Sequence, residues 1–114
     1  MSVKDYVFDC LSVYVDDFYI TKGELEGFVS FLLEEFEGRE DKIFDLGFSY
    51  YSSVDEVVHY ELESMLGGNV SEKSIDLLNQ YIFPFLDCDE VLDRIELNTG
   101  RWYYRSDYFI IEIY

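Results

Sequence analysis

Residues 20–38 read ITKGELEGFVSFLLEEFEG, and this stretch holds the start, the stop and both faces of one helix. Thr21 and Glu24 have the spacing of a capping box, in which each side chain accepts a hydrogen bond from the backbone N–H of the other residue. Gly38 suits the left-handed position that ends a helix. At about 100° per residue, one face is apolar and the other acidic. The apolar face carries Leu25, Phe28, Val29, Leu32 and Phe36, and the acidic face carries Glu26, Glu34 and Glu37.

The residues on either side predict further helices from their capping and helix-ending residues. Ser2 can cap a first helix that runs to about Asp17, and residues 39–45 fit a short helix or turn. Ser53 and Glu56 form a second capping box. Later boundaries are a stop at Gly67 and Gly68, a cap at Ser71 and a bend or end at Pro84. Buried positions of the helix after Ser71 are expected at Ile75, Leu78, Ile82 and Phe85.

After about Val91 the pattern changes from helical to alternating, which is typical of β-strands. Strands are expected around Ile95 and Leu97, over residues 101–105 and over residues 108–114, with Phe109, Ile111 and Ile113 facing the helices. The predicted fold class is therefore α+β, with four or five helices followed by a C-terminal three-stranded antiparallel β-meander. The length fits a single acidic globular domain over residues 1–114.

The net charge is the strongest compositional signal. The 114 residues include 25 Asp and Glu against 8 Lys and Arg, which gives a formal charge of −17. A folded chain is expected, because an aromatic content of 19% is far above that of disordered chains. The negative field opposes direct binding to nucleic acid or to an anionic membrane, and it attracts a basic partner. Adaptation to high salt is the alternative explanation of this charge.

Two features predict a soluble, cytoplasmic protein. The N-terminal run MSVKDYVFDC has no basic region followed by an apolar one, so a secretory signal is not expected. No apolar run approaches the ~18 residues that a membrane span requires. We therefore expect Cys10 and Cys88 to be reduced.

Catalytic motifs are not found in the sequence. His59 is the single histidine, and no phosphate-binding loop, nucleophile elbow or zinc-type cluster occurs. The acidic run from Asp87 to Asp93 departs from a calcium loop, because Val91 occupies a ligand position and no glycine follows. The basic residues Arg94, Arg101 and Arg105 are expected to pair with nearby carboxylates rather than with nucleic acid. We therefore expect no enzyme activity, no cofactor and no metal.

Carboxylates gather in three parts of the sequence, and the first two supply the predicted partner-binding residues. Carboxylates one helical turn apart are ~6 Å from each other, a spacing comparable with that of successive phosphates. Exposed aromatic side chains among them would supply anchors. The predicted partner-binding residues are Phe31, Glu34, Glu35, Glu37, Glu40 and Asp41 in the first part, and Asp55, Glu56, Tyr60 and Glu63 in the second. The third part contains Asp87, Asp89, Glu90, Asp93 and Glu96.

A small domain that is acidic along its length, rich in Tyr and Phe and without catalytic motifs resembles the phage-encoded anti-CRISPR and anti-restriction proteins that imitate DNA. The resemblance is one of composition and architecture, and it assigns no residue roles. It implies a non-catalytic inhibitor that covers the basic nucleic-acid-binding surface of a CRISPR effector or a restriction enzyme.

A second resemblance is to the immunity proteins that neutralise bacterial nuclease toxins. The run DDFYITKGELEGF, residues 16–28, is similar to the first helical hairpin of immunity proteins against tRNA-cutting colicins. This resemblance implies a nuclease toxin as the partner. A homodimer formed through the aromatic face of the last strand also stays open.

Overall fold

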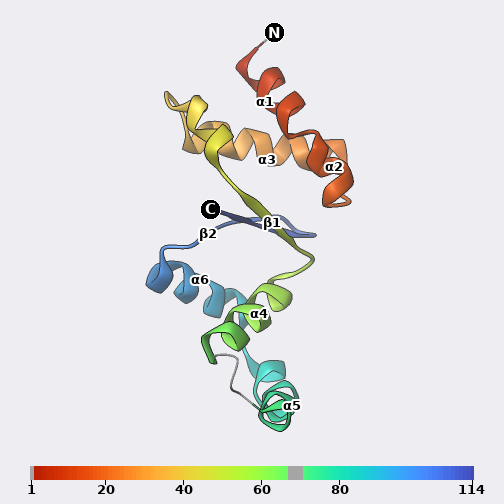
Figure 1. Ribbon diagram of the computed structural model, residues 1–114, viewed down its shortest axis with the longest axis vertical. Helices are drawn as coiled ribbons and strands as arrows, with labels where there is room; N and C mark the ends of the chain where they lie inside the picture. The colour runs from red at the N-terminus through yellow and green to blue at the C-terminus, as the bar shows by residue number, and fades with distance from the viewer. Residues whose placement is uncertain (1, 67–70) are drawn as a thin grey trace. The chain divides into compact units, whose positions relative to one another are not determined.

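The computed structural model describes residues 2–66 and 71–114 and divides into two compact units (Figure 1). We call residues 1–47 the N-terminal unit and residues 48–114 the C-terminal unit. The described residues form six α-helices, two 3₁₀-helices and a three-stranded antiparallel sheet, which confirms the predicted α+β class. That the chain acts as a single domain stays a prediction. The predicted helix stop at Gly67 and Gly68 lies outside the described residues.

The N-terminal unit is built from helices. They are α1 (Val3–Leu11), α2 (Val13–Asp17), α3 (Lys22–Glu35) and the 3₁₀-helix η1 (Glu40–Asp45). Both α1 and α2 pack against α3. The buried side chains of the unit are Val7, Leu11, Ile20, Leu25, Phe28, Val29, Leu32 and Ile43. Each fully buried apolar side chain of this size contributes ~1.5–3 kcal/mol to stability.

The predicted start of α3 and most of its apolar face are confirmed, whereas the helix ends at Glu35, before the predicted stop at Gly38, and Phe36 is a half-buried C-cap residue. The hydroxyl of Thr21 accepts a hydrogen bond from the N–H of Glu24 at 3.0 Å, and the carboxylate of Glu24 accepts one from the N–H of Thr21 at 2.9 Å. The apolar face is buried as predicted, from Leu25 to Leu32. Gly38 has the expected left-handed backbone, with φ of 81°, and follows the helix end by three residues. The capping box therefore fixes where α3 begins.

The first helix is divided at Ser12, whereas the sequence predicts one helix to about Asp17. The N–H of Ser12 donates to the carbonyl of Asp9 at 3.3 Å, and the hydroxyl of Ser12 donates to the same oxygen at 2.7 Å. This back-bonding tightens the turn to a 3₁₀ geometry and competes with continuation of the α-helix. Cys10 is exposed, and Cys10 and Cys88 are both free.

The C-terminal unit combines the sheet with the remaining helices. In order along the chain these are β1 (Phe48–Tyr51), α4 (Val54–Leu66), α5 (Glu72–Tyr81), the 3₁₀-helix η2 (Phe83–Phe85), α6 (Cys88–Thr99), β2 (Trp102–Arg105) and β3 (Ile110–Ile113). The strand order is β1-β3-β2, with both pairs antiparallel. No helix among the described residues has the length and apolarity needed to cross a membrane.

One strand of the sheet comes from a different part of the chain than predicted. Residues 88–99, where alternation at Ile95 and Leu97 predicts a strand, form α6, and the third strand is β1. Two local signals favour the helix: the Asp87 side chain accepts a hydrogen bond from the N–H of Glu90, and Gly100 ends the helix with φ of 71°. The alternation is short, and Leu97 is exposed.

The face of the sheet toward α4 and α6 also differs from the prediction. Ile110 packs in a hydrophobic cluster with Val57 and Val58 of α4 and with Leu92 and Ile95 of α6. Because side chains alternate along a strand, Ile111 and Ile113 point to the other face. Both faces of β3 carry buried isoleucines, so the sequence pattern does not distinguish them, and a one-residue change of register exchanges the faces.

Candidate partner-binding surface

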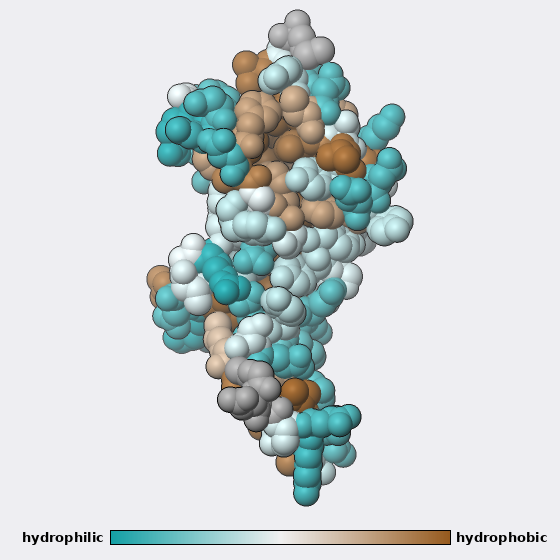
Figure 2. Space-filling model, viewed as in Figure 1, coloured by the Kyte–Doolittle hydropathy of each residue, from teal (hydrophilic) through white to brown (hydrophobic). Residues whose placement is uncertain are grey.

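The first predicted group of residues lies at the junction of α3 and η1. We call Phe31, Glu34, Glu35, Glu37, Glu40 and Asp41 the acidic ridge. Its carboxylate residues are exposed apart from Glu40, which is half-buried. Figure 2 shows hydrophilic residues gathered over this part of the N-terminal unit. The six residues thus lie close together along the chain, from the last turns of α3 to the first of η1.

Local hydrogen bonds hold the backbone of the ridge. The N–H of Gly38 donates to the carboxylate of Glu40 at 3.1 Å. The guanidinium of Arg39 donates to the carbonyl of Glu35 at 3.3 Å and lies over the ring of Phe36, 5.4 Å from its centroid. Arg39 therefore satisfies a carbonyl at the negative end of the helix. Its contacts are with the helix end and the ring rather than with the ridge carboxylates.

The ridge carboxylates have no salt bridge to any residue in the described part of the chain. The salt bridge found in the N-terminal unit joins Lys4 to Glu26 at 3.3 Å. Carboxylates near the C-terminal end of a helix are electrostatically unfavourable, as are like charges one turn apart. Glu34 and Glu35 are therefore placed where they do not favour the helix, while remaining accessible to solvent.

Phe31 is half-buried in α3, next to the ridge carboxylates in sequence. Part of its ring is thus accessible, as expected for a residue outside the buried face of Leu25, Phe28 and Leu32. Its role as an aromatic anchor stays a prediction.

The second predicted group lies on α4, in the C-terminal unit. The carboxylate of Glu56 accepts hydrogen bonds from the N–H of Ser52, at 2.7 Å, and from the hydroxyl of Ser52. The Ser53 hydroxyl accepts from the N–H of Glu56 at 3.2 Å. The predicted capping box is thus corrected: the return bond of Glu56 goes to Ser52 and not to Ser53. Glu56 is engaged in holding the start of α4.

The other members of this group differ in exposure. Burial comes first, followed by the hydrogen bond that the thiol donates to the Asp55 carboxylate and by the charge of Asp55, and together they raise the pKa of the Cys88 thiol to about 11. Asp55 therefore lies against the start of α6. Tyr60 is 55% exposed, and its ring is 5.9 Å from that of Tyr51. Glu63 is half-buried. Tyr60 is the most accessible aromatic side chain of the predicted set.

Three carboxylates of the third sequence cluster are paired with arginines, as expected for the basic residues near the C-terminus. Arg105 binds Asp93 at 2.8 Å and Glu96 at 3.0 Å, and Arg94 lies 3.9 Å from Glu90. Asp89 and Glu90 also occupy the first turn of α6, where the helix dipole favours negative charge. Two arginines thus pair with three of the five carboxylates, and Asp87 and Asp89 form no salt bridge among the described residues.

A buried ionic cluster on α4 and the sheet was not among the predicted site residues. Glu61 is 1% exposed and pairs with Arg101, which also lies 3.7 Å from Glu112. The hydroxyl of Tyr51 donates to Glu112 at 3.4 Å. The sequence could have indicated the burial of Glu61. Helical periodicity places Glu61 on the same face of α4 as Val54, Val57 and Val58.

The same cluster alters the ionisation of Tyr103. Its side chain is buried beside Glu61, Glu112 and Arg101. Burial, and then the charges of Glu112 and Glu61, raise the pKa of the Tyr103 hydroxyl to about 12, against the opposing effect of Arg101. Tyr103 is therefore held neutral in this environment.

Metal ligands and the single histidine are the remaining features to consider among the described residues. Within 2–66 and 71–114, no group of three or more His, Cys, Asp or Glu side chains is arranged to hold a metal ion. The ring of His59 stacks on Phe83, with centroids 4.5 Å apart, and is half-buried. No family model, curated protein sequence or solved structure matches the chain.

Proposed function

We propose that this protein is a non-catalytic acidic inhibitor that blocks the basic nucleic-acid-binding surface of a partner by nucleic-acid mimicry. The best-supported biological setting is a phage anti-defence protein of the anti-CRISPR type. The observation that carries the proposal is the acidic ridge, whose carboxylates are clustered, mostly exposed and without a salt bridge among the described residues.

The ridge has the chemistry that a nucleic-acid-binding groove recognises. Lys and Arg side chains that bind phosphates also form charge-assisted hydrogen bonds with carboxylates. Glu34 and Glu35 lie in the last turn of α3, so the helix sets the position of their backbone before binding. The net charge of −17 steers a basic surface toward the protein and raises the association rate.

An immunity protein against a nuclease toxin is the second candidate. One observation favours it: residues 16–28, which resemble an immunity-protein hairpin, span the end of α2, a turn and the first half of α3. In that turn Tyr19 has φ of 54° and is 93% exposed. A non-glycine residue in this conformation is uncommon.

A competition experiment tests the proposal. Labelled nucleic acid is bound to a purified CRISPR effector complex, a restriction enzyme or a tRNA-cutting toxin domain, and this protein is added. Displacement of DNA from one of the first two supports anti-defence, and displacement of tRNA from the toxin supports immunity. In the absence of nucleic acid, direct binding of this protein to the inhibited partner should weaken steeply as salt rises toward ~1 M, where the screening length is ~3 Å. A partner bound equally well at low and high salt would contradict mimicry.

A matched pair of variants locates the interface. Glu34→Gln, Glu35→Gln and Glu37→Gln together should lower the association rate by roughly tenfold. Asp9→Asn, Asp16→Asn and Asp17→Asn change the net charge equally at exposed positions outside the ridge, and should lower it much less. Equal effects of the two triple variants would mean that the association rate depends on the net charge of the protein and not on the ridge.

A further inference from the structure

The apolar side of α5 is only partly covered by the described residues, because Ile75 and Leu78 are half-buried. The sequence predicts Ile75, Leu78, Ile82 and Phe85 as buried, but no residue of α5 is buried, and Phe85 of η2 is 81% exposed. Leu77 and Tyr81 on the same helix are 47% and 59% exposed. A helix with this pattern normally gains most of its stability by packing its apolar face. The face of α5 is therefore available for a contact that the described residues do not supply.

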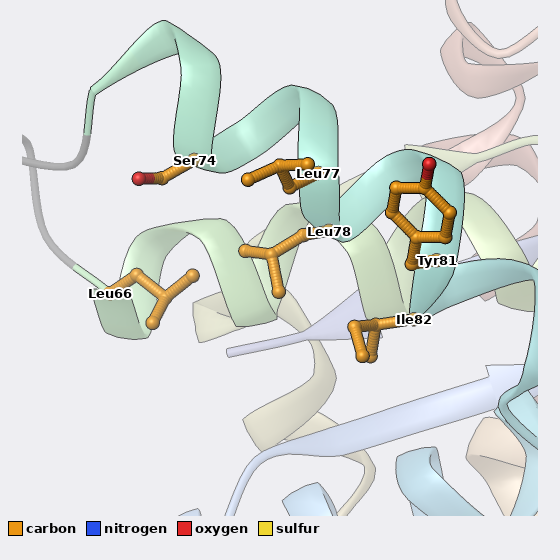
Figure 3. Close-up of a pocket in the computed structure, with 6 residues that line it drawn as sticks. All are labelled: Leu66, Ser74, Leu77, Leu78, Tyr81 and Ile82. Carbon is orange, nitrogen blue, oxygen red and sulfur yellow. The ribbon is translucent and has the colours of Figure 1, made fainter.

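The partly covered face lines a groove between α5 and the end of α4. The groove has a volume of about 450 Å³ and is lined by Leu66 of α4 and by Ser74, Leu77, Leu78, Tyr81 and Ile82. Figure 3 shows Leu78 and Ile82 pointing from α5 toward α4, and Leu66 at the end of α4. A second hollow of about 260 Å³ shares Leu66, Leu78 and Ile82 and adds Met65 and Phe83. The two hollows are neighbours, because they share these three lining residues.

The spacing of the lining residues fits a helix as the occupant. Positions 74, 77, 78, 81 and 82 repeat every three to four residues along α5. They extend over about two helical turns, or ~12 Å. A partner helix with apolar residues at i, i+3 or i+4, and i+7 presents the complementary ridge.

The charge of the unit favours a basic helix. The C-terminal unit has 13 Asp and Glu against 4 Lys and Arg, a net charge of −9. Its three arginines are all in salt bridges, which leaves Lys73 as the basic residue without one in the described part of this unit. A second copy of the chain would bring another −17 and be repelled, whereas a helix flanked by Lys and Arg is attracted.

We propose that the α4–α5 groove binds a basic amphipathic helix of a partner protein. Apolar side chains of that helix fill the groove, and its Lys and Arg side chains face the negative field around it. The groove belongs to the C-terminal unit and the acidic ridge to the N-terminal unit, so this proposal goes beyond nucleic-acid mimicry and does not depend on it.

A synthetic peptide serves as the probe. It has roughly 14 residues, or four turns, with leucines on one helical face and lysines on the other, and a fluorescent label reports binding by anisotropy. A peptide of the same composition in alternating order and a leucine–glutamate peptide are the controls. The basic helical peptide should bind at least tenfold more tightly than both. Equal binding of the alternating peptide would overturn the proposal.

Paired variants place the peptide on the protein. Leu77→Gln with Tyr81→Gln should weaken binding at least tenfold, whereas Leu97→Gln with Tyr108→Gln, also at exposed positions, should change it less than about twofold. All four positions are exposed, so circular dichroism should show the fold of both variants unchanged. Equal weakening by the two pairs, or no weakening by the first, would overturn the proposal.

Two further measurements separate this proposal from the alternatives. The variant with Glu34, Glu35 and Glu37 changed to Gln should retain groove binding, whereas loss of binding in that variant alone would place the peptide on the ridge and overturn the proposal. Sedimentation of the protein alone should show a monomer. A dimer that Leu77→Gln with Tyr81→Gln abolishes would make a second copy the occupant of the groove and overturn the proposal.

Discussion

The two units carry almost the same net charge, but they differ in how their carboxylates are paired with arginines. The N-terminal unit has 12 acidic and 4 basic residues, net −8, and the C-terminal unit is net −9. In the first, Arg39 caps a helix end and the ridge carboxylates are left without salt bridges in the described residues. In the second, Arg101 and Arg105 each bind two carboxylates. The position of the arginines, rather than the number of carboxylates, decides which acidic residues are available to a partner.

The largest expected effect comes from removing the cation of the buried cluster. Arg101→Ala should lower the free energy of unfolding by about 3 kcal/mol, because Glu61 is left buried without its counter-charge. Urea denaturation at pH 7 measures the change. Arg94→Ala removes an exposed pair and should cost less than about 0.5 kcal/mol. Similar losses in both variants would mean that the buried and exposed pairs do not differ.

A pH dependence is expected from Tyr103. Its pKa is about 12 in the folded protein and ~10 when unfolded. Stability from the neutral hydroxyl is complete below pH ~10 and is lost as pH rises toward 12, because the unfolded chain then releases its proton first. The loss is about 1.4 kcal/mol per pH unit in that window.

Tyr103→Phe should remove this component of the pH profile, measured by denaturation between pH 8 and pH 11. Tyr108→Phe, at a position 78% exposed, is the control and should keep the profile of the original protein. An unchanged profile in Tyr103→Phe would show that the hydroxyl titrates as it does in the unfolded chain.

The smallest expected effect comes from removing carboxylates, and it compares the two units directly. Changing Glu34, Glu35 and Glu37 to Gln should raise the free energy of unfolding by about 0.5 kcal/mol, because repulsion at the negative end of α3 is relieved. Glu56→Ala in the C-terminal unit should instead lower it by about 1 kcal/mol, because the bonds to Ser52 are lost. Thermal denaturation of the two variants measures the sign of each change in the free energy of unfolding. Changes of the same sign would contradict the proposed difference between the units.

Local signals in the sequence predict the helices well. The boundaries of α3 and the caps at Ser2 and Ser71 follow from hydrogen bonds within three or four residues, and these bonds are present. The location of β1, in contrast, does not follow from local signals. Phe48–Tyr51 becomes a strand because it pairs with β3, far away in sequence, and nothing within the segment itself specifies that partner.

In the candidate site, too, features set by the local sequence could be predicted and features set by contacts with distant residues could not. The exposure of Glu34 could be predicted, because helical periodicity places it opposite the buried face of α3. The exposure of Glu35 could not, because Glu35 lies seven residues after Phe28 and thus on nearly the same side of the helix. The burial of Glu61 depends on Arg101 and Glu112, which come from other elements. The partly covered face of α5 could not be predicted either, because amphipathic periodicity identifies an apolar face without saying whether another element covers it.

The strand order β1-β3-β2 has a consequence for the time course of folding. β2 and β3 are joined by a short turn, so this hairpin can form within microseconds. β1 joins only when Phe48 reaches Ile113, and α4, α5 and α6 all lie in the loop that this pairing closes. Long-range pairing of this kind slows folding. The N-terminal unit, whose helices contact near neighbours in sequence, should therefore become ordered first, and completion of the sheet should set the rate for the rest of the chain.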